Sequence, residues 1–147
     1  MRLISFLCLC ALLSGCATTS GQKDTYNPLQ KKFEMAKQYY DQGLFTQSES
    51  LYLEISRKHP KLYEPHMRLG NLYVRVNQLD AAILRYEKAL ALKPNDVKAW
   101  NNLALVRVKQ AIKILEEGQV EFESNSFEYI ALESHKQKLI GAVAQKR

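Results

Sequence analysis

The chain has 147 residues, a formal net charge of +6 and a pI near 9.2, so it is long enough for one small domain or a short repeat array. Its three cysteines, Cys8, Cys10 and Cys16, all lie within the first 16 residues. Residues 17–147 therefore cannot hold a disulfide, a thiolate nucleophile or a zinc site built on cysteine.

The N-terminus begins with a positive charge at Arg2, followed by an uncharged, largely apolar run over residues 3–13. As a helix this run spans about 16 Å, roughly half the hydrocarbon core of a bilayer. The length therefore favours a secretory signal over a membrane span.

The apolar run ends in Leu13-Ser14-Gly15-Cys16, which resembles a bacterial lipobox. The resemblance implies that residues 1–15 are a signal peptide and that Cys16 carries lipid, because its thiolate is the nucleophile for lipid transfer. The alternative is an ordinary signal peptide cleaved elsewhere. Ala17, where the sorting rule of enteric bacteria places Asp in inner-membrane lipoproteins, favours the periplasmic face of the outer membrane. Residues 16–27 then form the lipidated cysteine and a polar tether with a reach of about 18 Å.

The body contains a repeat of period 34, with copies at residues 29–62 and 63–96. The matched positions are Met35-Ala36 with Leu69-Gly70, Tyr39 with Tyr73, Phe45 with Leu79, Tyr52 with Tyr86, and Pro60 with Pro94. The pattern resembles the tetratricopeptide repeat (TPR) family, whose unit is a helix–turn–helix. The resemblance implies an all-α, right-handed superhelix of about two and a half repeats over residues 28–118.

The third copy, over residues 97–118, is partial. Ala111 stands where the turn is expected, and the apolar period continues through it, so we expect one longer helix over about 96–117. The C-terminal region, 119–147, is predicted to form a helix that covers the end of the array, with Ser126 as the N-cap of that helix. Its expected array-facing residues are Phe127, Ile130 and Ala131, and further along Leu139, Ile140 and Val143.

The sequence has no catalytic constellation. His59, His66 and His135 lack metal-ligand spacing, and no phosphate-binding loop or nucleophile elbow is present. The basic residues are scattered rather than clustered with aromatics, which argues against nucleic acid as a partner. We therefore expect neither an enzyme nor a metal site, and no cofactor besides the lipid on Cys16.

The concave face of a TPR array is its usual binding surface, and we expect it to hold an extended peptide or a helix of a protein partner. Asn71 and Asn102 also match the asparagines of the two-lysine, two-asparagine carboxylate clamp of TPR co-chaperones, but Met67 replaces the first lysine. Carried over from the family, the expected groove residues are Phe33, Lys37, Tyr40, Met67, Asn71, Val74, Arg75, Lys98, Asn101 and Leu105.

The combined features resemble Gram-negative TPR lipoproteins of pilus or secretion systems, such as type IV pilotins and Tad-pilus assembly lipoproteins. This resemblance implies an outer-membrane-anchored periplasmic adaptor that binds a protein partner during envelope assembly. The alternative is a homodimeric scaffold that regulates a cell-wall enzyme, with apolar residues such as Phe33 or Phe122 in the dimer interface.

Overall fold

The computed structural model describes residues 27–144. The predicted signal peptide at 1–15, the lipidation site Cys16 and the tether up to residue 26 lie outside the described residues. Within 27–144 the chain is all-helical and contains no strand. The all-α fold predicted from the sequence is therefore confirmed.

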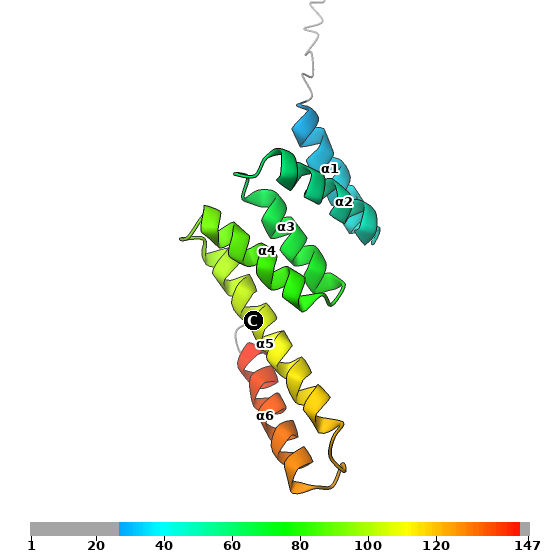
Figure 1. Cartoon of the computed structure of the whole chain (residues 1–147), viewed down its shortest axis with the longest axis vertical. Helices are drawn as coiled ribbons and strands as arrows, with labels where there is room; N and C mark the ends of the chain where they lie inside the picture. The colour runs from blue at the N-terminus through cyan, green and yellow to red at the C-terminus, as the bar shows by residue number, and fades with distance from the viewer. Residues whose placement is uncertain (1–26, 145–147) are drawn as a thin grey trace, which may run out of the picture.

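The helices stack in chain order along one long axis (Figure 1), and the extensive contacts are all between consecutive helices. The helix α1 begins at one end of this axis, and the α5–α6 hairpin projects at the other. Such stacking, in which each unit contacts only its neighbours, is the organisation of a solenoid. The helices are α1 (Pro28–Asp41), α2 (Phe45–Lys58), α3 (Glu64–Arg75), α4 (Leu79–Leu92), α5 (Val97–Gln119) and α6 (Phe127–Ala144).

The turns inside the first two repeats occupy equivalent positions. Gly43, between α1 and α2, has φ +76°, and Asn77, between α3 and α4, has φ +58°. Glycine and asparagine are the residues that adopt this left-handed conformation at least cost. Ala111, the equivalent residue of the third copy, lies within α5, so the expectation of one longer helix is confirmed.

Small residues set the closest helix crossings. A Cβ on Gly70 of α3 would lie 2.5 Å from the Tyr86 ring of α4, so only glycine allows this approach. In the first repeat Ala36 and Ser48 are both fully buried, and the Ser48 hydroxyl donates to the Ala36 carbonyl oxygen at 2.8 Å. The buried hydroxyl is thereby satisfied at the crossing.

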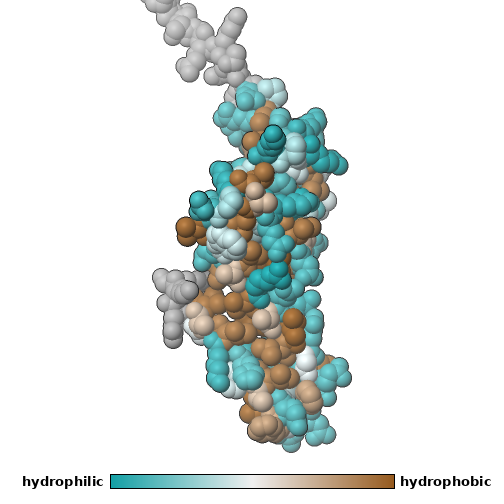
Figure 2. Space-filling view, turned by 60° about the vertical axis from the view of Figure 1, so that its left-hand side comes forward, coloured by the Kyte–Doolittle hydropathy of each residue, from teal (hydrophilic) through white to brown (hydrophobic). Residues whose placement is uncertain are grey.

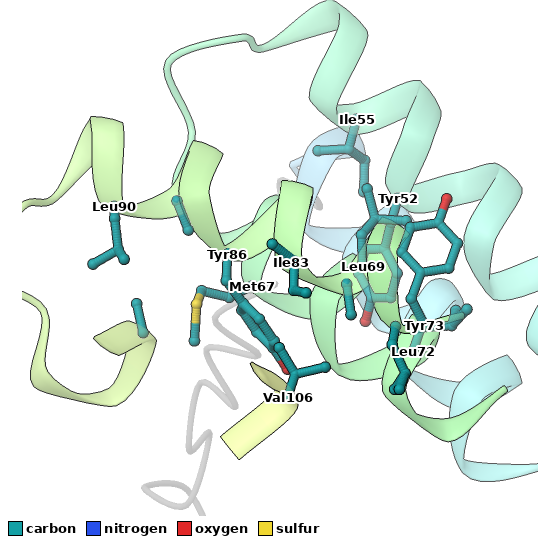
Figure 3. Packing of buried hydrophobic residues seen from close by; sticks show 14 of the residues in the cluster. Tyr52, Ile55, Met67, Leu69, Leu72, Tyr73, Ile83, Tyr86, Leu90 and Val106 are labelled. Carbon is teal, nitrogen blue, oxygen red and sulfur yellow. The ribbon is translucent and has the colours of Figure 1, made fainter. Parts of the chain in front are cut away.

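The core lies mainly between α2, α3 and α4, where aromatic and branched side chains of the repeat interlock (Figure 3). Helix α5 contributes only Ala99 and Val106 to this cluster, and α6 contributes no buried residue. Stability therefore depends mostly on the central helices, and the α5–α6 hairpin is attached to them through α5.

The C-terminal hairpin differs in part from the sequence prediction. The Ser126 hydroxyl accepts from the Tyr129 N–H at 3.2 Å, which fits its expected position before the last helix. Phe127 and Ile130 were expected to face the array, but they are 81% and 58% exposed. That expectation is wrong because α6 packs along α5 and leaves this face in solvent.

No helix within residues 27–144 is long and apolar enough to cross a bilayer.

Candidate functional site

A groove with a cavity of about 480 Å³ opens between the first helices of the repeats and the end of α6. This volume is in the range of about 300–1,000 Å³ that is typical of ligand pockets. Its walls come from five helices: Tyr40 of α1; Asn71, Val74 and Arg75 of α3; Tyr86 of α4; Asn102, Leu105, Val106, Val108, Lys109 and Ile112 of α5; and Ile140 and Val143 of α6. We call these residues the groove.

The groove is mainly apolar. Figure 2 shows hydrophobic side chains gathered around a hollow at mid-height, with hydrophilic side chains flanking them. Leu105 is 40% exposed and Ile140 is 41% exposed, so both present apolar surface to solvent. Exposed apolar surface in a concave site, rimmed by polar residues, is typical of a binding surface.

A hydrogen-bond network lies on one wall of the groove. The Tyr86 hydroxyl donates to Asn71 Oδ1 at 2.7 Å, and the Asn102 amide donates to the same oxygen at 3.2 Å. Burial raises the pKa of Tyr86 to about 12, so its hydroxyl stays protonated at neutral pH and remains a donor. Both donors bond to Asn71 Oδ1 and so fix the orientation of the Asn71 side chain. Its amide N–H groups then remain available to a ligand.

The charged residues of the groove are all basic. Arg75 and Lys109 line it and no carboxylate does. Both side chains are exposed, and neither forms an ion pair within residues 27–144. The groove therefore offers apolar surface together with hydrogen-bond donors and positive charge.

The structure brings half of the expected groove residues together. Tyr40, Asn71, Val74, Arg75 and Leu105 line the one cavity, together with Val108. The TPR pattern locates these side chains because they point from α1, α3 and α5 toward the same concave face.

The other five expected groove residues lie elsewhere. Met67 is 4% exposed and belongs to the buried core (Figure 3), so its side chain cannot reach a ligand. Phe33 packs against the core, with its ring centroid 6.1 Å from that of Tyr52. Lys37 pairs with Asp41, and Lys98 and Asn101 are exposed on the first turns of α5, outside the cavity.

The burial of Met67 also bears on the carboxylate clamp. The clamp position filled by Met67 carries no charge and lies in the core, and the two asparagines bond to each other. The cations of this groove, Arg75 and Lys109, lie at other positions.

The sequence prediction missed several groove residues. Lys109 and Ile112 lie one and two helical turns after Leu105 on the same face of α5. The apolar period that continues through Ala111 could therefore have indicated that this face extends beyond Val108. Ile140 and Val143 of α6 were expected to face the array, and they do so as part of the groove wall.

A second cavity, of about 460 Å³, lies beside the turn between α3 and α4. Its polar lining is engaged internally, since the Gln110 amide donates to Asp80 at 2.6 Å. No group of three or more histidine, cysteine, aspartate or glutamate residues within 27–144 is arranged to hold a metal ion.

Comparisons with known proteins agree with this geometry. Residues 70–111 match the family model of the TPR repeat. A solved structure, the first TPR of Spaghetti (RPAP3) bound to HSP90 peptide SRMEEVD, is similar with a TM-score of 0.54 and 21% identity. The similarity covers 79% of this chain and 93% of that one. This chain has the TPR fold. TPR repeats are generally binding scaffolds, and neither comparison indicates a catalytic family. No curated protein matches the chain.

Proposed function

We propose that this chain is a periplasmic TPR adaptor, anchored to the outer membrane by lipid on Cys16, whose groove binds a segment of a partner protein. The observation that carries the proposal is the groove itself, an open apolar cavity rimmed by Arg75, Lys109 and the Asn71 amide. A segment with apolar side chains and a carboxylate or other hydrogen-bond acceptor complements this lining.

The similar TPR structure supports a peptide as the ligand class. That protein is bound to a peptide, SRMEEVD, which contains two glutamates and an aspartate. At 21% identity the likeness concerns the fold, so the particular peptide does not transfer to this chain. In this chain the unpaired cations Arg75 and Lys109 suit an acidic segment through charge complementarity.

The partner would belong to envelope assembly, in a pilus or secretion system. This part rests on the sequence, through the lipobox at residues 13–16 and the resemblance to pilotins and Tad-pilus lipoproteins. An anchor at Cys16 would concentrate the groove at the membrane and raise the local concentration for any partner there.

The groove assignment can be tested with two matched leucines. Leu105 of α5 lines the groove and is 40% exposed, whereas Leu84 of α4 lies outside it and is 50% exposed. Affinity capture from the native host followed by quantitative mass spectrometry should show partners retained by Leu84→Asp and lost by Leu105→Asp. Equal retention by both variants contradicts the proposal, and circular dichroism verifies that both fold.

The anchor is tested separately with Cys16→Ser. The native chain should partition into detergent and yield a diacylglyceryl-modified N-terminal peptide starting at Cys16 by mass spectrometry. The variant should move to the aqueous phase. A native N-terminus other than Cys16, without lipid, contradicts this part and leaves the groove assignment standing.

A further inference from the structure

The end of the α5–α6 hairpin exposes a second apolar surface. Val120 and Phe127 are 82% and 81% exposed, Ile130 is 58% exposed and Phe122 is 42% exposed. We call these four residues the hairpin tip. Figure 2 shows apolar surface at this lower end of the molecule, away from the groove. Exposed apolar residues gathered at one end mark an interaction surface, since solvated helix ends normally carry polar side chains.

The chain around the hairpin tip is strongly acidic. Residues 114–135 contain six glutamates and no lysine or arginine. Three of these carboxylates, Glu121, Glu123 and Glu128, form no ion pair within the described helices and their connections. The tip therefore combines unpaired negative charge with aromatic side chains.

The rest of the described chain has the opposite charge. Residues 28–110 carry 14 lysines and arginines against 8 aspartates and glutamates. The groove in particular is apolar with Arg75 and Lys109 unpaired, so its chemistry complements that of the tip in both charge and hydrophobicity.

The tip cannot reach the groove of its own chain. Helix α5 is continuous and holds residue 120 about two turns, roughly 12 Å, beyond Ile112, the last α5 residue of the groove. Figure 1 shows the connection between α5 and α6 at the far end of the long axis. A groove that accepts this tip must therefore belong to another molecule.

We propose that the hairpin tip of one copy docks into the groove of a second copy. The aromatic residues Phe122 and Phe127 occupy the apolar part, while Glu121 and Glu123 lie against Arg75 and Lys109 of the second copy. The contact joins two different surfaces, so it is head-to-tail and leaves a free groove and a free tip at the ends.

This inference rests on the groove of the proposed function, and it implies that self-association regulates partner binding at that site. A second copy and a partner protein compete for the same surface, so partner binding disassembles the head-to-tail chain. A symmetric tip-to-tip dimer is disfavoured, since it would bring the unpaired glutamates of both copies together.

The test uses sedimentation velocity on the full chain and two double variants. The tip variant is Phe122→Ser/Phe127→Ser, and the groove variant is Arg75→Glu/Lys109→Glu. All four positions are exposed, so the helical content should stay unchanged by circular dichroism. The native chain should associate with rising concentration, and added salt should weaken this association about tenfold or more.

Mixing the two variants gives the decisive result. Each variant alone should stay monomeric, because one half of every contact is missing. The mixture should form a 1:1 dimer and nothing larger, since the intact groove of one variant accepts the intact tip of the other. The N-terminal segment is the same in all samples, so it cannot produce this pattern.

Three results overturn the inference: a native chain that is monomeric at all concentrations, association that survives in the groove variant, or a mixture that stays monomeric. These results are distinguishable from failure of the proposed function. If Leu105→Asp still loses a captured partner while the native chain is monomeric, only the self-association is wrong. If both fail, the groove is not a binding site.

Discussion

The substitution Gly70→Ala tests whether the close crossing of α3 and α4 requires glycine at this position. The added Cβ would lie 2.5 to 2.8 Å from three atoms of the Tyr86 ring, a distance that real Cβ contacts do not tolerate. Tyr86 is 2% exposed, so its ring is packed on nearly all sides and cannot move without displacing its neighbours. Its displacement would also break the 2.7 Å bond from its hydroxyl to Asn71.

The magnitude follows from two opposing effects. Overpacking a close-packed site costs about 1–3 kcal/mol, and alanine returns about 1 kcal/mol of helix propensity over glycine. We expect a net loss of up to about 2 kcal/mol in the free energy of unfolding, which lowers the urea midpoint by up to about 1 M. Gly141→Ala in α6 is the matched control, since its Cβ would meet nothing within 4 Å, and it should be neutral or stabilising.

A double-mutant cycle with Tyr86→Leu isolates the clash. Urea unfolding followed by circular dichroism should show that Gly70→Ala costs much less in the Tyr86→Leu background, because the ring that it strikes is gone. Equal cost in both backgrounds would refute the reasoning that the Tyr86 ring is what requires glycine at position 70.

Three further predictions concern conformational strain and pH. Gly43→Ala should destabilise by about 1–2 kcal/mol although nothing lies within 4 Å of the new Cβ, because the residue keeps φ at +76°; urea unfolding that matches Gly141→Ala would contradict this. Burial lowers the pKa of His66 below 6.5, so as the pH falls the unfolded chain takes up a proton before the folded chain does. Stability should therefore decrease as the pH drops below about 6.5. In His66→Phe, the thermal midpoint should change less with pH over this range. The hydrogen bond from Lys136, together with those from two glutamines, lowers the pKa of Glu133 to about 2. The stabilisation from the ionised Glu133 is therefore complete above about pH 4.5 and declines toward pH 2. If Glu133→Gln leaves the pH dependence of the thermal midpoint in acid unchanged, these bonds do not contribute to stability.

The repeat architecture could be predicted from the sequence because its signals are local. A left-handed turn needs glycine or asparagine, and Gly43 and Asn77 supply them one repeat apart, whereas Ala111 does not. The same reasoning predicted the continuous helix α5. Both features depend only on the residues at the turn and on the apolar period that flanks it.

The parts that the sequence did not predict depend on packing over longer distances. Phe127 and Ile130 share a helical face with one another, but the period does not say which face of α6 meets α5. Met67 occupies a position that faces the groove in other TPR units, yet here it is in the core. Ile140 and Val143 were expected to face the array, but their place in the groove wall follows from the direction of the hairpin, which the connection over residues 120–126 does not encode locally.

The central claim, that the groove is where a partner protein binds, is tested most directly by site-specific photo-crosslinking in the native host. A photoreactive amino acid at Lys109, in the groove, is compared with one at Lys88, an exposed residue of α4 outside it. We expect a partner adduct from position 109 that is absent from position 88 and disappears with Leu105→Asp. Adducts of equal yield from both positions, or from position 88 alone, would contradict it.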